Sequence, residues 1–510
     1  MQSSNFLCAA LPSVVTHCDN VLKDHPEYID SEKINSFFKA NVDKFLTSIG
    51  VVLNKLPTDP VKKEKILEKG RMNKKLIDKY VKMLDNMRSK EYLKDCEIVI
   101  DSGAFSLQVG YFDKSEIVPF IDLYNNEFLV NNYEKFKYAF LFDVAPGAVE
   151  CPFDSFGELR DMADYSYNIS SKLPQAVRDK CLYVHHFRTP NINKIYKDLL
   201  NKYGEKFNNF ATGGLVSFSR AGKVPPYIMY IVPLLRVLDH ALERGIKSFR
   251  FHVLGGSEWK EILGHKFLER HIKEVFDIDV QITYDSSTLF KTLCMGRYTF
   301  FPDHTQKRLS KLSIRSALKD TYASTPGSDI IQEKTNEELF CQMINEVVMP
   351  HGMKALDVNE IPLYDIQNNM VVDFDIKHEP PKGKLNRLVY TYGMLHLLNI
   401  FKVVEEWSTE FVDQTYSRFL KPAEFDNEFN KEVEHIMGMF NGLENFKLSS
   451  VGFKSSTIHN TLELISSFKT NRTKVLKLTD QLVNDYMGGD ECEKLKPELD
   501  KFQNQDTIDD

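Results

Sequence analysis

The chain has no paired cysteines, no glycine-rich phosphate loop and no long apolar run. Its eight cysteines stand singly along 510 residues, without the CxxC or CxC spacing of a zinc site or a redox dithiol. Neither a P-loop nor a dinucleotide-binding GxGxxG is present. The most apolar stretch, Tyr227 to Leu242, is broken by Arg236 and Asp239, and no basic segment followed by a long apolar one opens the chain. We therefore expect a cytoplasmic protein with reduced thiols, no metal site, no cofactor and no membrane span.

The chain also lacks an excess of positive charge, since its formal net charge is −7. This balance excludes a protein coated in basic residues, but phosphate binding depends on local patches rather than on the total. Lysines concentrate between Lys55 and Lys94 in a pattern typical of helices. There the pattern favours a solvated helix face over a phosphate-binding surface.

Eight short apolar or β-rich runs alternate with longer helical, charged stretches over the first three hundred residues. This alternation predicts an α/β fold of the TIM type, a (β/α)8 barrel of parallel strands. The predicted strands are Phe6 to Ala10, Ile49 to Leu53, Glu97 to Ile100, Tyr138 to Phe142, Leu182 to His185, Asn209 to Thr212, Ser248 to Val253 and Val280 to Tyr284.

Beyond Arg315 the β-rich runs mostly stop and amphipathic helical patterns dominate. We expect a barrel over residues 1–315, with a lysine-rich helical insertion around 55–94. A mostly helical C-terminal domain is predicted over 316–487. The last residues, 488–510, are polar and acidic and are predicted to form a flexible tail.

Acidic residues, histidines and glycine pairs gather where the predicted strands end. In a barrel, the loops at the carboxyl ends of the strands shape the active site. A single aspartate there is commonly a turn former or a helix cap, but three on one rim are hard to explain as turns. The residues at these ends are Asp101 and Ser102, Asp143, His185 and His186, Gly213 and Gly214, Gly255 and Gly256, and Asp285.

Such a set suits the exchange of a base at an N-glycosidic bond. Breaking this bond develops positive charge at the sugar C1′, which one carboxylate can stabilise and then capture covalently. A second acid moves a proton on or off the departing and entering bases. Gly-Gly segments let backbone groups approach a flat heterocycle, and a third carboxylate can accept hydrogen bonds from the donor edge of a guanine-like ring.

Five segments, in this order along most of the barrel, resemble the motifs of the tRNA-guanine transglycosylase superfamily. Asp101-Ser102-Gly103-Ala104-Phe105 is similar to the DSGGF motif of the superfamily, and Phe142-Asp143 is similar to its FDE segment. Ala211-Thr212-Gly213-Gly214-Leu215 is similar to its AIGGL segment, Leu254-Gly255 to its MG turn, and Tyr284-Asp285-Ser286 to its FD nucleophile motif.

The resemblance implies roles for individual residues. Asp285 would be the nucleophile, Asp101 the general acid/base and Asp143 the group that reads the base edge. The remaining residues would bind the base. Phe105 and Leu254 would sandwich it, although both could equally be core residues, and Gly213 and Gly214 would contact its carbonyl or 7-substituent. The other predicted base contacts are Ser102, Gly255, His185 and His186, and the two histidines stand where the family has a glutamine-glycine pair.

Two departures separate the chain from the tRNA-acting enzymes. After Asp285 only Cys294 and His304 lie nearby, too few for the family's CxCxxC-plus-His zinc site, and the family's archaeal RNA-binding accessory domain is not evident. With its Ser-Gly-Ala-Phe variant and long helical C-terminal region, the chain resembles the DpdA-type DNA-guanine transglycosylases of bacteria and their phages. This resemblance implies replacement of guanine in DNA by a 7-deazaguanine such as 7-cyano-7-deazaguanine (preQ0), which protects the DNA from restriction.

A base in a duplex is stacked and paired, so the resemblance also implies base flipping and basic residues near the rim. The predicted nucleic-acid contacts are Arg220, Lys223, Lys307 and Arg308. Expected partners are DNA, the 7-deazaguanine base, and either a second copy of the chain or an accessory protein.

Three alternatives stay open at this point. One is a tRNA-guanine transglycosylase of the queuine type with the same catalytic pair, and another is a noncatalytic nucleic-acid-binding barrel subunit. The third is a carbohydrate hydrolase that uses two carboxylates, for which the chain offers only Trp259 and Trp407 as sugar platforms.

Overall fold

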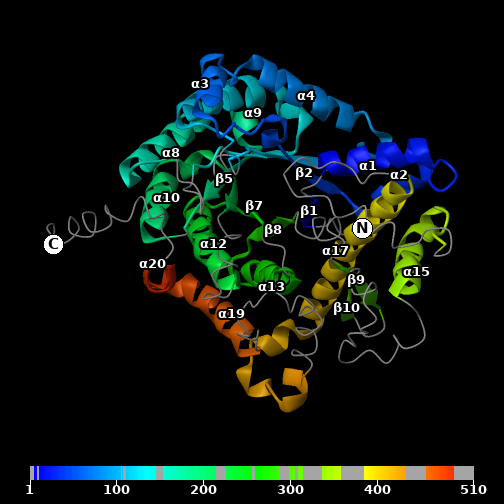
Figure 1. Cartoon of the computed structure of the whole chain (residues 1–510). Helices are drawn as coiled ribbons and strands as arrows, with labels where there is room; N and C mark the ends of the chain where they lie inside the picture. Colours follow the sequence, from blue (N-terminus) through cyan, green and yellow to red (C-terminus); the bar gives the residue numbers. More distant parts are fainter. Residues whose placement is uncertain are drawn as a thin grey trace.

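Eight parallel strands close into a barrel, which confirms the predicted TIM-type (β/α)8 fold (Figure 1). The computed structural model describes residues 5–8, 11–104, 106, 111–144, 153–187, 189–213, 226–255, 259–286, 298–304, 308–313, 336–357, 384–431 and 455–487. The strands are β1 (Phe6–Cys8), β2 (Lys44–Ser48), β3 (Glu97–Asp101), β4 (Tyr138–Phe140), β5 (Cys181–His185), β6 (Asn209–Thr212), β7 (Ser248–Val253) and β8 (Asp279–Ser286). β8 pairs with β1 and closes the ring.

Helices surround the barrel in the order that the alternating pattern requires (Figure 1). Side chains such as Asp30, Ser155 and Thr189 cap their first turns by accepting backbone N–H groups. The helices are α1 (Leu11–Asp24), α2 (Ser31–Asn41), α3 (Pro60–Glu68), α4 (Lys74–Arg88), α6 (Ile117–Asp122), α7 (Val130–Asn132), α8 (Phe156–Ser171), α9 (Gln175–Arg178), α10 (Pro190–Tyr203), α12 (Pro226–Glu243) and α13 (Trp259–Phe276), with a π-helical stretch at Leu123–Leu129.

The second strand departs from the prediction. The apolar run Ile49 to Leu53 was expected to be β2, but Ile49–Val52 forms the 3-10 helix η1 and β2 is the preceding Lys44–Ser48. The strand was not recognised because it begins with Lys44, a charged residue. The Lys44 side chain is only 1% exposed, lies inside the barrel and pairs with Asp43 at 3.1 Å. The other seven predicted runs overlap the observed strands.

Alternate side chains of the strands point into the barrel and form layers. The interior holds a small apolar cluster separate from the main core, made of Leu7, Leu46, Val99, Phe140, Leu182, Val184 and Ala211. Their neighbours in sequence, such as Phe45 and Tyr183, belong to the main core between strands and helices. The small cluster therefore lies between the two ends of the barrel interior.

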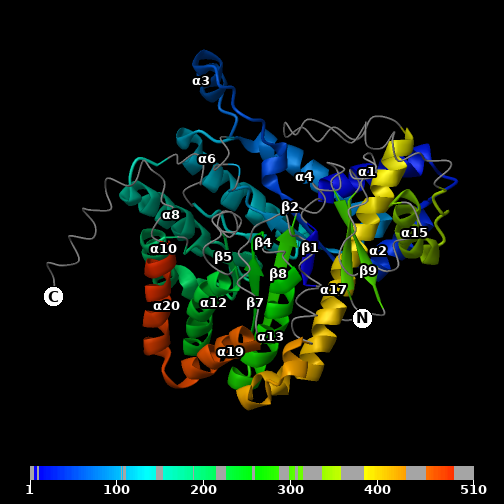
Figure 2. The same cartoon turned by 60° about the horizontal axis from the view of Figure 1, so that its bottom comes forward.

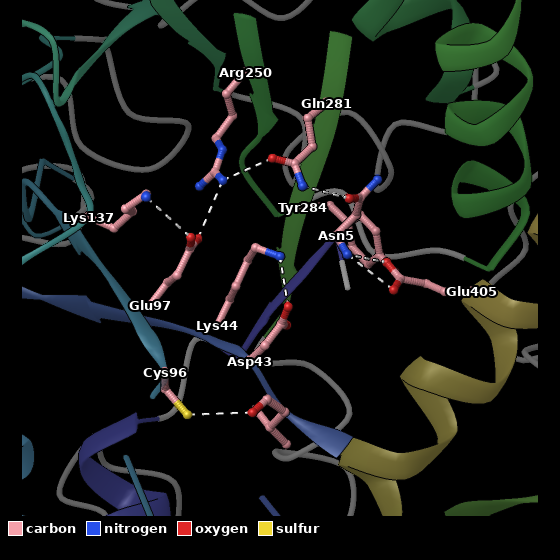
Figure 3. A network of polar contacts seen from close by, with 11 residues as sticks. Asn5, Asp43, Lys44, Cys96, Glu97, Lys137, Arg250, Gln281, Tyr284 and Glu405 are labelled. Carbon is pink, nitrogen blue, oxygen red and sulfur yellow. Dashed lines mark hydrogen bonds and ion pairs between the residues drawn. The ribbon is translucent and has the colours of Figure 1, made fainter. Parts of the chain in front are cut away.

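A polar network fills the amino-terminal end of the barrel (Figure 3). Arg250 lies over the Tyr138 ring, donates to Gln281 at 2.9 Å and pairs with Glu97 at 3.4 Å. Gln281 in turn donates to the side chain of Asn5 at 3.1 Å. These interactions link β3, β7, β8 and the segment before β1, so this end contributes to stability, and the opposite end is where a substrate would enter.

The long helix α17 (Lys384–Phe419) fills the gap in the helical layer between α13 and α1 (Figure 1). Phe401 stacks on Phe6 of β1 with 3.6 Å between ring centroids, and Glu405 accepts the Asn5 backbone N–H and the Tyr284 hydroxyl. The helix thus supports the short strand β1 where the barrel closes. The predicted boundary at residue 315 therefore does not separate the barrel's helical layer from the later helices.

The remaining C-terminal elements lie against the outside of the barrel (Figure 2). Asp480 pairs with Arg236, accepts from Asn193 at 3.1 Å and pairs with Lys197 at 3.2 Å. The predicted tail at 488–510 lies outside the described residues, and none of the described helices combines the length and apolarity needed to cross a membrane. These elements are α15 (Asn336–Val348), α19 (Ser455–Thr470), α20 (Arg472–Met487) and the hairpin of β9 (Tyr298–Asp303) and β10 (Arg308–Ser313).

Candidate active site

Asp101 ends β3 at the carboxyl-terminal end of the barrel, level with Ser48 on β2. Burial raises its pKa to about 6, against hydrogen bonds from Ser48 and the Gly103 backbone that favour the ionised form. The charges of Asp143 and Asp285 raise the pKa further. Asp101 therefore takes up and releases its proton much closer to neutral pH than an ordinary aspartate does, as an acid/base group requires.

The turn after Asp101 depends on glycine. Gly103 has a φ of +77°, which residues with a side chain rarely adopt. A Cβ atom there would lie 2.9 Å from the backbone nitrogen of Gly50, in η1. The close approach of Gly103 and Gly50 packs the turn that carries Ser102 directly against η1.

Asp143 follows β4 and is 8% exposed. Its Oδ2 lies 2.6 Å from Nε2 of His186, and its Oδ1 accepts from the Ser102 hydroxyl at 3.4 Å. The His186 ring lies against Gly213, where a Cβ atom would be 2.6 Å from Cε1 of the ring, and edge-on to Tyr196. Ser102 and His186 thus fix the Asp143 carboxylate, and Gly213 leaves the room that His186 needs.

Asp285, near the end of β8, is held by two donors on one oxygen. The backbone N–H of Gly255 donates to its Oδ1 at 2.8 Å, and Nε2 of His252 lies 3.1 Å from the same atom. Burial lowers the pKa of His252, which favours the neutral ring. Because a carboxylate only accepts hydrogen bonds, we assign the proton of the neutral ring to Nε2, and Nδ1 accepts from the Thr283 hydroxyl at 2.9 Å.

No protein-family model matches the chain, and searches of curated proteins and of solved structures find no match either. Within the described residues, no group of three or more His, Cys, Asp or Glu side chains is placed to hold a metal ion.

The structure brings most of the described sequence-predicted residues together. Leu254 directly follows β7 and packs against the small apolar cluster inside the barrel. Gly255 has a φ of +73° and turns its N–H toward Asp285. The other predicted residues that the structure gathers on this rim are Asp101, Ser102, Asp143, His186, Gly213 and Asp285.

His185 is a correction to the expected base contacts. Val184 points into the barrel, so the side chain of His185 faces outward, edge-on to Tyr196 with 6.3 Å between ring centroids. Burial lowers the pKa of His185 to about 3, so the ring is neutral. It is a residue of the layer between strands and helices and does not join the rim.

Five predicted residues cannot be placed: Phe105, Gly214, Arg220, Lys223 and Lys307 lie outside the described residues. Arg308 is described only as the first residue of β10. The structure therefore gives the positions of Asp101, Asp285 and Asp143, but not of the predicted phosphate contacts.

Sequence reasoning missed three residues that support the site: His252, Thr283 and Ser48. A signal for His252 exists in β7, where Phe249, Phe251 and Val253 belong to the main core and the residues between them are polar. Period-two alternation places such a polar residue inside the barrel, one step below the rim.

Proposed function

We propose that the chain is a DNA-guanine transglycosylase, which exchanges guanine in DNA for a 7-deazaguanine base such as 7-cyano-7-deazaguanine. The observation that carries the proposal is the different environment of two carboxyls at one end of the barrel. Asp101 has a pKa raised to about 6 by burial and by its acidic neighbours, whereas Asp285 is oriented by Gly255 and His252. Pairs of acids whose environments differ in this way serve as acid/base and nucleophile.

In the first half-reaction, Asp285 attacks C1′ of the target deoxyguanosine. Both donors bind Oδ1, so attack through Oδ2 keeps these two hydrogen bonds in place. The C1′–N9 bond breaks as the C1′–O bond to Asp285 forms, and Asp101 in its acid form gives a proton to a ring nitrogen of the departing guanine. The products are a covalent deoxyribosyl ester and neutral guanine.

In the second half-reaction, the entering base replaces guanine in the pocket. Asp101, now a carboxylate, accepts the N9 proton of the 7-deazaguanine while N9 attacks C1′ and the ester to Asp285 breaks. Asp101 ends in the acid form in which it began, so the cycle consumes no external acid, oxidant or nucleotide.

Asp143 suits recognition of the base edge. A guanine-like base presents two neighbouring donors, N1–H and the 2-amino group, which a carboxylate can accept together. The contacts of Asp143 with Ser102 and His186 hold the carboxylate in a single orientation, and each carboxylate oxygen has a second lone pair for the base. The same geometry would serve guanine in tRNA, so the choice of DNA rests on the family resemblance.

Wash-in of radiolabelled guanine tests the proposal with purified protein. The wild-type chain should transfer label into a guanine-containing oligodeoxynucleotide and not into tRNA, and Asp285→Asn should abolish the transfer. Asp279→Asn is the matched control, because Asp279 is an exposed aspartate at the other end of β8. Label in tRNA alone would reassign the substrate, and full transfer by folded Asp285→Asn would exclude this nucleophile.

A further inference from the structure

A helical arm extends from the barrel between β2 and α4. Residues 55–70 follow Leu53, with Leu56 still buried against the body, carry α3 (Pro60–Glu68) and return at Arg71. Figure 2 shows α3 standing away from the rest of the molecule. Because the arm follows β2, it belongs to the carboxyl-terminal end of the barrel, the end that carries Asp101 and Asp285.

The base of the arm is firmly held. The Arg71 guanidinium donates to the Asn54 carbonyl at 2.6 Å, to the Tyr111 carbonyl, and to both carboxylate oxygens of Glu116 at 2.7 and 2.8 Å. Higher on the arm, Lys63 pairs with Asp113 at 2.8 Å. Both anchors tie the arm to the segment 111–116, which follows the Asp101 turn in the chain.

Burial in the hydrophobic core does not explain why α3 forms. None of its residues is buried, and Val61 and Ile66 are 60% and 37% exposed. A solvated helix ordinarily has a second, apolar face that packs on the body, and a helix of this length is marginal in water without such contacts. Simple solvation of a helix face, which the sequence favours, therefore leaves the existence of α3 unexplained.

Positive charge is concentrated in the arm and in the first half of α4. From Lys55 to Lys82 the chain has ten lysine or arginine residues and four acidic ones, a net charge of +6, of which residues 55–70 carry +2, while the rest of the chain carries −13. At about 100° per residue, Lys62, Lys65 and Lys69 lie within about 60° of one another around the helix, and Glu64 and Glu68 lie on the adjacent flank, about 110° from the centre of this group. These three lysines are exposed, and in the described part of the chain none of them makes an ion pair.

We propose that the arm binds the phosphate backbone of DNA next to the nucleotide that enters the barrel. The inference rests on the proposed function and adds to it a surface that holds the DNA at the rim. A row of unpaired lysines on a raised, anchored helix complements the negative charge of the phosphates, which supplies most of the affinity in such complexes.

Two triple variants with equal loss of charge test the proposal. The arm variant is Lys62→Gln/Lys65→Gln/Lys69→Gln. The control variant is Lys94→Gln/Lys172→Gln/Lys206→Gln, whose exposed lysines lie in the segments that lead into β3, β5 and β6, at the opposite end of the barrel. Binding of a fluorescent, guanine-containing oligodeoxynucleotide is measured over a salt series, as single strand and as duplex.

The arm variant should bind DNA at least about tenfold more weakly at low salt. The slope of log K against log [salt] should fall in magnitude by about 2 for the single strand and about 3 for the duplex, since each phosphate contact contributes about 0.7 or 0.9. The control variant should keep the wild-type slope. An unchanged slope in the arm variant, or an equal loss in both variants, would overturn the proposal.

Label transfer from guanine, measured on the same proteins, separates the two proposals. Transfer by wild type together with an unchanged slope in the arm variant means that the arm assignment is wrong and the enzymatic one stands. A reduced slope in the arm variant, together with no label transfer by wild type, means that the arm assignment stands and the enzymatic proposal is wrong. Salt-dependent binding of tRNA through the arm, with no binding of DNA by wild type, would exclude DNA as the partner.

Discussion

Replacing Asp101 by asparagine should stabilise the protein at neutral pH while it abolishes base exchange. Burial and the neighbouring acids raise the pKa of Asp101 from 3.8 to about 6. The folded state therefore holds the proton more tightly than the unfolded chain, and the ionised carboxylate destabilises the fold above pH 6. At about 1.4 kcal/mol per pH unit, this destabilisation is about 3 kcal/mol at pH 7.5.

The pH dependence of the destabilisation by Asp101 provides a control for this prediction. The destabilisation by Asp101 is complete above the folded pKa, falls to about half near pH 5 and vanishes below about pH 3.8. Unfolding entropy scales with length, so 3 kcal/mol corresponds to about 3 °C in Tm for 510 residues. Asparagine keeps the side-chain carbonyl that accepts a hydrogen bond and removes the charge.

Differential scanning calorimetry at pH 7.5 and pH 5 measures the effect. Asp101→Asn should raise Tm by about 3 °C at pH 7.5 and by about half as much at pH 5. Asp279→Asn, at an exposed site on β8, should change Tm little at either pH. A lower Tm for Asp101→Asn at pH 7.5, or an equal gain at both pH values, would refute the electrostatic account of this site.

Three further substitutions follow from the contacts of the rim. Asp143→Ala should chiefly relax selection among purine analogues, because it leaves the donor edge of the base unpaired, and unchanged discrimination in competition assays would count against its role. Gly213→Ala should reduce exchange by about tenfold or more without unfolding the chain, because the new Cβ displaces His186 from Asp143; wild-type kinetics with a normal melting curve would contradict this. Gly103→Ala should cost about 2 kcal/mol or more, seen as a Tm lower by about 2 °C, because of its positive φ and the contact with Gly50. An unchanged Tm would show that the turn relaxes freely.

The barrel could be predicted because parallel strands buried on both faces read as apolar runs. The prediction failed at β2 for a reason that lies outside the strand. Lys44 is accommodated inside the barrel by a polar layer that Glu97, Arg250 and Gln281 also form, and these residues come from distant strands. A local sequence pattern does not reveal this layer, so the apolar residues of η1 matched the pattern of a buried strand better than β2 did.

The candidate site was predictable where a residue lies at or just beyond the carboxyl end of a strand, and less so where it lies deeper in the strand. Asp101, Asp143 and Asp285 follow the rule that function gathers at the carboxyl ends of barrel strands. The choice between His185 and His186 was not visible, because Cys181 to Val184 are all buried and show no alternation. The place of α17 beside β1 depends on contacts between residues about 400 positions apart, such as Asn5 with Glu405.

Nucleoside mass spectrometry of cellular DNA and tRNA tests the central claim most directly. Cells that express the chain and are supplied with a 7-deazaguanine base should contain a deazaguanine deoxynucleoside in DNA and none in tRNA. The DNA signal should disappear with Asp285→Asn and persist with Asp279→Asn. A deazaguanine nucleoside in tRNA alone, or a DNA signal that survives Asp285→Asn, would contradict the account.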